Sequence, residues 1–316
     1  MKLRDLRHTP FFRILGFVLV ALLFGYVFWK ILANLDALRA YPWHLVPGFL
    51  VLGVLVLSAT NFTASLVWLR ILSASGERIA WSRAITAWIL SRLGRYVPGK
   101  VWMFVGLVAL VPEARRGVVL STVGIHTVLD LLAGVTLAVM TFPALALGFR
   151  ETVHLPPGWF LGGLIFVVAL ALNPRFIQWL LRKTSDRDIE IEWGYPQLVL
   201  WFLMLLGLWL LRILGHLLFI RGFGITVDYL ALAAAFSASW LLGMISPFAP
   251  SGLGVREGLL TYLLQGVTAP GLAPIIAILT RLNSTIMDLV LGLPAWLMRS
   301  VLKMPSKDET SSQPSE

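Results

Sequence analysis

Cysteine is absent from the 316 residues, and charged residues are scarce at 13% of the chain. Without cysteine there is no disulfide and no thiolate ligand for a metal, and cysteine usage does not reveal the redox compartment. Soluble domains carry about 25% charged residues, so this chain would be unable to cover a water-facing surface. The sequence motifs of zinc proteases, serine hydrolases and P-loop nucleotide-binding proteins are absent as well. A soluble globular fold is therefore excluded.

Apolar residues are abundant, at 58% of the chain, and they occur in long runs. A transmembrane helix needs about 20 consecutive, predominantly apolar residues. The runs predict an all-α, polytopic membrane helix bundle with about seven spanning helices. The first run is too long for the apolar core of a signal peptide and has no convincing cleavage site after it, so we expect a retained helix. The predicted spans cover residues 11–29, 46–69, 117–145, 158–172, 197–220, 229–245 and 272–302.

Lysine and arginine outnumber aspartate and glutamate by 26 to 16. Sixteen of these 26 cations lie in segments that would share one side of the membrane with the N-terminus, and four lie in the opposite segments. Because positive residues mark cytoplasmic loops, we expect a protein of the cytoplasmic membrane with both termini in the cytoplasm. The same distribution accounts for the net charge of +10 without nucleic acid as a partner.

A Pro-Gly pair interrupts the apolar stretch between Ala84 and Val111, and both flanks of this stretch are basic. The stretch should therefore begin and end on the same side of the membrane. Pro98 lacks a backbone donor and Gly99 tolerates a turn. Irregular backbone at membrane depth must be buried in protein or line a hydrated cavity, so we expect a re-entrant hairpin here.

A second interruption, SPFAPSGLGVREG at residues 246–258, divides the apolar stretch from Tyr229 to Leu264. We expect another re-entrant hairpin, entering from the opposite face. The segments VPGKVWMFVG and APSGLGVREG begin 152 residues apart and share a proline and their final glycine. Paired broken helices in the two halves of a chain indicate a transporter binding site, and an inverted repeat is our prediction.

Three cations surround the first break: Arg92, Arg95 and Lys100. A charge facing lipid at the bilayer centre costs about 2.5–3.5 kcal/mol. These side chains should therefore pair, line a hydrated cavity or, in the alternative for Arg92, extend to the interface. We favour a cavity, which would suit a lipid phosphate beside helix N-terminal amides.

Arg256 and Glu257 begin the helix that follows the second break. An acidic side chain at a helix start is stabilised by the helix dipole. The two residues would either contribute to a binding site or form a helix cap and an ion pair within the bundle.

The stretch PSGLGVREG, together with RYVPGKVW and Arg281 in the last apolar run, resembles the lysylphosphatidylglycerol synthase transmembrane-region family, also called the flippase-like domain family. The resemblance covers nearly the whole chain. It implies that the residues matching the two motifs of the family are Pro98, Gly99, Pro250, Gly252, Gly254 and Glu257.

In two-domain relatives, the resemblance implies a membrane module that moves aminoacylated phosphatidylglycerol between leaflets. Here only a short polar tail follows Lys303, so we expect a stand-alone member without the aminoacyl-transferase domain and without synthesis of lysyl-lipid. Residues 1–304 would form the flippase-like membrane domain, and residues 305–316 a disordered cytoplasmic tail. The chain departs from many relatives at Leu107, where a basic residue is expected.

Other polar residues of the apolar runs are spaced so that they share helix faces. Such pairs either relay protons and balance charge in a transport cycle, or they form static interhelical hydrogen bonds. The pairs are His126 with Asp130, Arg212 with His216 and, two turns apart, Arg281 with Asp288; the candidate relay residues are His126, Asp130 and Asp288.

These features predict a protein that translocates or binds a polar-headed membrane lipid, without cofactor or metal. The candidate lipids are an anionic or aminoacylated phospholipid and a polyprenyl-phosphate-linked sugar. Two alternatives stay open: a transferase or hydrolase acting on a lipid headgroup through His126, Asp130 or Glu257, and a scaffold for a lipid-biosynthetic enzyme. We expect Arg92, Arg95, Lys100 and Arg256 to bind phosphate, and Glu257 and Arg281 to form an intramembrane ion network.

Overall fold

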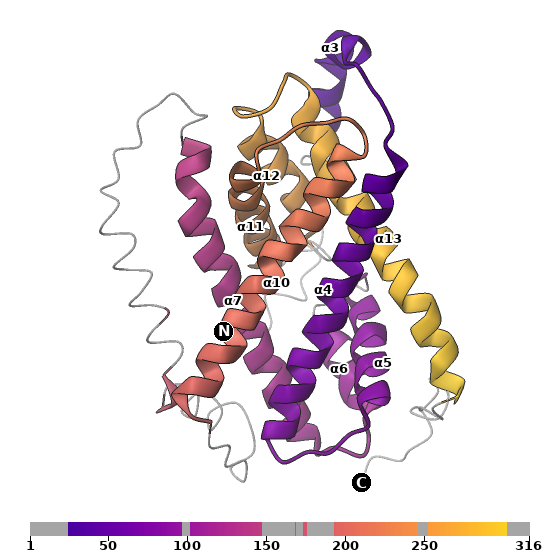
Figure 1. Ribbon diagram of the computed structural model, residues 1–316, viewed down its shortest axis with the longest axis vertical. Helices are drawn as coiled ribbons and strands as arrows, with labels where there is room; N and C mark the ends of the chain where they lie inside the picture. Colours follow the sequence, from indigo (N-terminus) through magenta and orange to yellow (C-terminus); the bar gives the residue numbers. More distant parts are fainter. Residues whose placement is uncertain are drawn as a thin grey trace, which may run out of the picture. The chain divides into compact units, whose positions relative to one another are not determined.

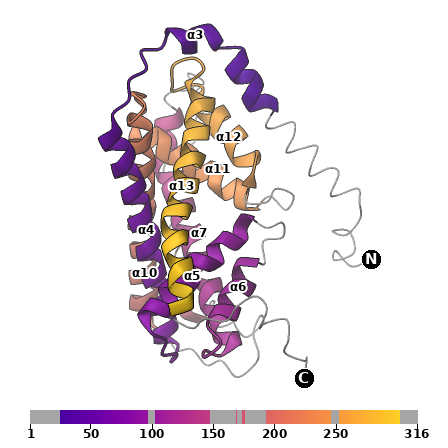
Figure 2. The same ribbon diagram turned by 90° about the vertical axis from the view of Figure 1, so that its right-hand side faces the viewer.

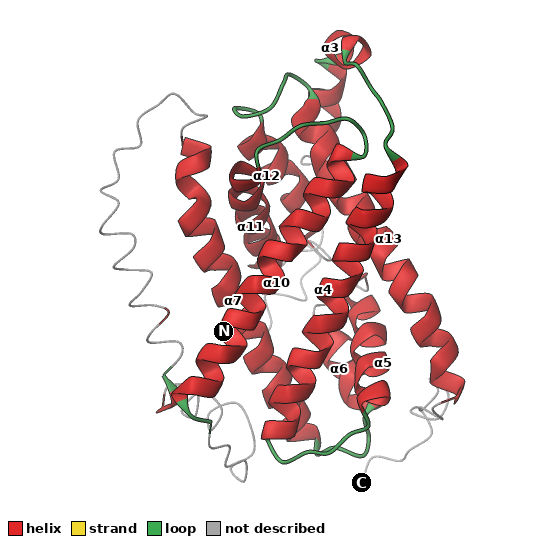
Figure 3. Cartoon of the chain, in the orientation of Figure 1, coloured by secondary structure: helices red, strands yellow, loops and turns green. Residues whose placement is uncertain are grey.

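The computed structural model describes residues 25–96, 102–146, 168, 173–175, 193–245 and 252–301. Figure 3 shows these residues as helices joined by loops, and no strand occurs among them. The predicted all-α fold is confirmed for the part of the chain that the structure describes.

Four helices are long and apolar enough to cross a membrane: α4 (Pro47–Ala74), α7 (Arg116–Ala146), α10 (Tyr195–Arg221) and α13 (Leu272–Val301) (Figure 1). Each has at least 27 residues, more than the ~20 that a bilayer core requires. A helix satisfies its backbone hydrogen bonds internally, which is why an apolar chain in lipid adopts this conformation. Four of the predicted apolar spans are therefore confirmed as helices of spanning length.

The remaining predicted spans are shorter or lie outside the described residues. Helix α11 (Tyr229–Ile245) has 17 residues, a length of about 25 Å against a hydrocarbon core of about 30 Å. Residues 25–32 are helical and continue the predicted first span, whose earlier residues lie outside the described part. The predicted span at 158–172 also lies outside it, except for position 168. The count of seven spans stays a prediction.

The chain divides into two compact units. Unit 1 comprises Met1–Leu57, Gly134–Gly162 and Trp209–Ile286, and unit 2 comprises the remaining residues. Each of the four long helices contributes residues to both units. Each unit also contains two short helices that flank one of the predicted breaks.

In unit 2, the short helices are α5 (Trp81–Arg92), continued by the 3-10 turn η1 (Leu93–Tyr96), and α6 (Trp102–Leu110). They run antiparallel and side by side (Figures 1 and 2), with the backbone of Gly94 against Met103 and that of Gly106 against Ser91. The two arms match the predicted hairpin at 84–111. Its tip, at 97–101, lies outside the described residues, and its re-entry into a membrane stays a prediction.

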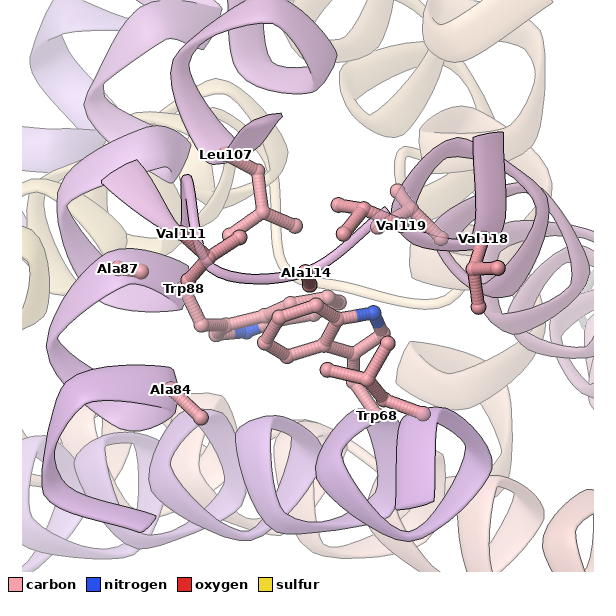
Figure 4. Close-up of a cluster of buried hydrophobic side chains, with 11 residues drawn as sticks. Trp68, Ala84, Ala87, Trp88, Leu107, Val111, Ala114, Val118 and Val119 are labelled. Carbon is pink, nitrogen blue, oxygen red and sulfur yellow. The ribbon is translucent and has the colours of Figure 1, made fainter. Parts of the chain in front are cut away.

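A tryptophan pair holds this hairpin to the rest of unit 2. The rings of Trp68 on α4 and Trp88 on α5 stack with centroids 5.4 Å apart, and both side chains are buried (Figure 4). Leu107 and Val111 pack in the same cluster, while the ring of His126 on α7 meets Trp88 edge-on at 4.7 Å. Buried aromatic pairs of this kind contribute about 0.5–1.5 kcal/mol beyond their area.

In unit 1, α4 and α10 approach each other closely through glycine. A Cβ atom on Gly53 would lie 2.7 Å from the backbone nitrogen of Phe219 and 2.8 Å from the carbonyl oxygen of Gly215. Small residues at helix interfaces allow such backbone contact, which drives helix association in lipid.

Replacing Gly53 by alanine is expected to lower the melting temperature of the detergent-solubilised protein, because the added methyl group would overlap backbone atoms of α10. Overpacking of this kind costs about 1–3 kcal/mol. The change can be followed by intrinsic tryptophan fluorescence during heating. Gly207→Ala on α10 is the matched control, since an added Cβ there meets no atom within 4 Å. Equal melting temperatures for the two variants would contradict the close contact.

Candidate functional site

Two glycines shape the backbone between α11 and α12 (Val255–Leu264) in unit 1. Gly252 and Gly254 have φ angles of 68° and 78°, in the left-handed region that side chains disfavour. A Cβ on Gly252 would also lie 3.0 Å from the Cα of Gly243 on α11. These glycines let α12 run back alongside α11 (Figures 1 and 2). The predicted break at 246–258 is thus flanked by two packed helices.

The pairing of α11 with α12 matches the break that was predicted inside the apolar stretch from Tyr229 to Leu264. Residues 229–245 were also counted among the seven spans. Helix α11 forms one arm of the hairpin and α12 forms the other. The entry of this hairpin into a membrane stays a prediction.

Glu257 combines two roles in the first turn of α12. Its Oε2 accepts a hydrogen bond from the backbone nitrogen of Gly254 at 2.8 Å, which caps the helix start. Its Oε1 lies 3.6 Å from Nη1 of Arg281 on α13. The carboxylate is 5% exposed and the guanidinium 19%. Glu257 therefore forms a helix cap and an ion pair, as one of the two alternatives from the sequence had it. The ion pair also brings together two predicted site residues, Glu257 and Arg281.

Arg256 points to a different set of partners. Its guanidinium carbon lies 4.6 Å from the ring centroid of Phe236 on α11, a cation–π contact. The ring of His216 on α10 also packs against Phe236, at 4.5 Å. All three side chains are buried, Arg256 to 8% exposure and His216 to 1%.

His216 extends the cluster to α13. Its Nδ1 lies 3.3 Å from Nδ2 of Asn283, and the same amide donates to the carbonyl oxygen of Gly215 at 3.2 Å. Arg212 lies four residues, about one helical turn, before His216 on α10. The guanidinium of Arg212 in turn lies 4.7 Å from the ring centroid of Trp209. Four helices of unit 1 thus contribute to one polar cluster, which we name the arginine cluster: Arg212, His216, Phe236, Arg256, Glu257, Arg281 and Asn283.

Positive charge exceeds negative charge in the arginine cluster. It holds three arginines and one carboxylate, and Glu257 is the one acidic residue among the buried residues described in unit 1. Bringing charges out of water costs several kcal/mol for each ion unless attraction and hydrogen bonds offset it. The contacts of Arg256 with Phe236 and of Arg281 with Glu257 therefore offset part of the cost of burying these charges.

Several buried polar atoms of unit 1 have no hydrogen-bond partner among the described residues. They are Ser237 Oγ on α11, Thr261 Oγ1 and Glu257 Oε1 on α12, and Asn283 Oδ1 on α13. Buried polar groups are nearly always hydrogen-bonded to protein or ordered water. These atoms belong to the helices that surround the arginine cluster, and they fit an interior that is hydrated or receives a polar ligand.

The structure brings together some of the predicted site residues. Gly252, Gly254, Arg256, Glu257 and Arg281 all belong to unit 1 and contribute to the break or the cluster. Other predicted residues, Arg92, His126, Asp130 and Asp288, belong to unit 2. Arg92 ends α5 and is partly buried, His126 contacts Trp88, and Asp288 is buried on α13.

The remaining predicted site residues are not described. Arg95 lies in η1, but its side chain is outside the described part. The residues that lie outside it altogether are Pro98, Gly99, Lys100 and Pro250. A site formed jointly by both hairpins stays a prediction.

Sequence reasoning missed four members of the arginine cluster. Arg212 and His216 were noted as a pair on one helix face, but nothing connected them to the second break. Asn283 lies two residues after Arg281 and was not singled out, and Phe236 is one of 18 phenylalanines. The available signal was the rarity of polar residues in apolar runs, which marks Arg212, His216 and Asn283 but not Phe236.

We expect Glu257 and Arg281 to be energetically coupled. Glu257→Gln and Arg281→Gln should each lower the melting temperature, because each removes one charge of a largely buried pair while keeping hydrogen-bonding capacity. The double variant should lose less than the sum, by a coupling energy of about 0.5–3 kcal/mol.

The control cycle uses Arg83 and Glu113 of unit 2, which form an ion pair at 3.0 Å with side chains about one-third exposed. Such pairs contribute about 0–1 kcal/mol. Additive losses at Glu257 and Arg281 would show that their proximity carries no energetic coupling.

Comparison with known families gives one match over nearly the whole chain. Residues 13–292 match the family described as lysylphosphatidylglycerol synthase TM region. No curated protein matches the chain. The match includes every residue of the arginine cluster and the helices on both sides of each break, in agreement with four described helices of membrane-spanning length. The chain is a multi-pass membrane protein that belongs to the lysylphosphatidylglycerol synthase transmembrane-region family.

Proposed function

We propose that this protein binds a phosphate-bearing lipid through the arginine cluster and moves its headgroup between the two leaflets. The observation that carries the proposal is the gathering of arginines beside a broken helix, where Arg256 is buried against Phe236 and Arg281 faces the Glu257 carboxylate. The membrane would be the cytoplasmic membrane, with both termini in the cytoplasm, as the distribution of basic residues predicts.

The energetics of the cluster favour an anionic headgroup. A guanidinium presents several N–H donors in a plane that matches phosphate oxygens, and such charge-assisted hydrogen bonds are about twice as strong as neutral ones. Arg256 is held against Phe236 and Arg281 against Glu257. Both guanidinium groups are therefore already held inside the protein. Binding a phosphate would not add the free-energy cost of removing them from water.

The break between α11 and α12 provides a route to movement. Gly252 and Gly254 have backbone angles that do not continue either helix, and hinge residues are those that absorb changes in φ and ψ. Glu257 holds α12 to α13 through Arg281. A phosphate that competes with Glu257 for Arg281 would loosen this attachment and let α12 tilt, which couples headgroup binding to a conformational change.

The arginine cluster favours a class of lipid, those that carry a phosphate, and does not identify a single compound. An anionic or aminoacylated phospholipid and a polyprenyl-phosphate-linked sugar all carry the phosphate that the cluster would bind. Arg92, Arg95 and Lys100 of the first hairpin would supply further phosphate contacts, and His126, Asp130 and Asp288 would balance charge or relay protons. An enzyme of lipid biosynthesis is the partner that we would expect to supply the lipid.

Replacing Arg256 by alanine is expected to slow leaflet exchange by about tenfold or more, because a hydrogen bond to a charged group contributes about 1.5–3 kcal/mol. The measurement uses purified protein in liposomes with fluorescent phosphatidylglycerol, and a membrane-impermeant reductant reports the lipid that becomes accessible outside. Arg39→Ala is the matched control, since Arg39 lies on helix α3 (Leu35–Ala40) with an exposed side chain. Both variants must elute as the wild type does in size-exclusion chromatography.

Two results would contradict the proposal. Equal exchange by wild type and Arg256→Ala would remove the arginine cluster from the mechanism. Exchange absent for every tested lipid, together with a change in lipid mass, would favour the transferase or hydrolase alternative, and Glu257→Gln would then be expected to abolish product formation.

A further inference from the structure

A groove on the surface of unit 1 lies between helical residues 25–32 and the α11–α12 hairpin. It has a volume of about 530 Å³, within the range of about 300–1,000 Å³ that ligand sites occupy. Its apolar wall consists of Trp29, Leu242, Val255, Gly258 and Leu259. Figure 2 shows that α11 and α12, which form one side of the groove, pack against each other.

Polar groups gather on the same groove from both sides. Lys30 and Tyr26 come from helical residues 25–32, while Tyr262 and Gln265 come from α12 and the residue after it. The Lys30 ammonium lies 5.4 Å from the centroid of the Trp29 ring and 5.9 Å from that of Tyr26, so two aromatic rings position its charge.

The groove therefore has two chemically different parts. One part is apolar, and the other presents an ammonium, two hydroxyls and an amide, all of which can donate hydrogen bonds. No acidic residue lines the groove among the described residues, so its charge is positive. A lipid with an anionic headgroup has the same division into an apolar chain and a polar, negatively charged end.

Helix α12 separates this groove from the arginine cluster. Its residues Val255, Leu259 and Tyr262 face the groove at helical spacing. Between them, Arg256 and Glu257 turn to the buried side. One helix thus has a groove on one face and the cationic interior on the other.

We propose that this groove is a lateral binding site for an anionic phospholipid, with its phosphate at Lys30 and the tyrosine hydroxyls and an acyl chain along α12. The proposal rests on the proposed function, since the groove would present the lipid to the arginine cluster when α12 moves. Lys30 would attract the phosphate of the lipid. No carboxylate among the described lining residues would bind the cationic group of a zwitterionic headgroup, so the groove favours an anionic lipid.

The test uses the natural lack of cysteine in the chain. A single cysteine at Leu242, whose side chain lines the groove and is 51% exposed, carries a benzophenone photocrosslinker. The protein is placed in nanodiscs with equal amounts of phosphatidylglycerol and phosphatidylcholine, and mass spectrometry gives the ratio of the two lipid adducts. Leu55→Cys on α4 is the control, because Leu55 is 55% exposed and does not line the groove.

The expected ratio of phosphatidylglycerol to phosphatidylcholine adducts is about fivefold higher at position 242 than at position 55, the enrichment that one lysine near a membrane surface produces. Lys30→Gln should remove the enrichment, and Lys30→Arg should keep it. Equal ratios at the two positions would show an annular lipid surface and overturn the proposal. Enrichment that persists in Lys30→Gln would overturn the assigned phosphate anchor.

A second background separates this proposal from the proposed function. Arg256→Ala is expected to slow leaflet exchange by about tenfold or more but to leave the adduct ratio at position 242 unchanged, because Arg256 does not line the groove. Slowed exchange with retained enrichment supports the groove as a separate binding step. If the protein exchanges lipid normally but shows no enrichment of phosphatidylglycerol adducts at position 242, the groove proposal is wrong and the proposed function still stands.

Discussion

The Glu257 carboxylate is the group on which the rest of unit 1 depends, because it satisfies two buried requirements at once. One oxygen caps the start of α12 at Gly254, and the other faces the guanidinium of Arg281. The cap marks where α12 begins, and the ion pair connects α12 to α13. Without the cap, a backbone N–H group at the start of α12 would lose its hydrogen-bond acceptor. Without the ion pair, the largely buried guanidinium of Arg281 would lose a negatively charged neighbour.

Glycine makes this double role geometrically feasible. Gly254 places the first turn of α12 at a backbone angle that other residues disfavour, and Gly252 contacts the backbone of α11 without an intervening side chain. Gly53 and Gly215 do the same for α4 and α10. Where the backbones approach closely, polar side chains of different helices can come within contact distance. Large side chains between the helices would hold the backbones, and with them these polar groups, farther apart.

Aromatic rings pack against several cations of unit 1. Phe236 lies against both Arg256 and His216, and Trp209 lies against Arg212. A ring holds a guanidinium by its quadrupole without neutralising its charge. These contacts orient the guanidinium groups inside unit 1. Tyr26 and Trp29 hold the ammonium of Lys30 at the groove by the same kind of contact.

Hydropathy and backbone chemistry are local properties, so the sequence by itself determined the helical class, four spanning-length helices and the positions of both breaks. Glu257 and Arg281 could also be identified, because a charge inside an apolar run is costly wherever it packs. The sequence could not connect Arg212, His216 and Asn283 to the second break. Helices that are apolar around their whole circumference have no periodicity to mark their inner face. Which side chains meet was therefore decided by tertiary packing alone, through the rotation of each helix and the close contacts that its glycines permit.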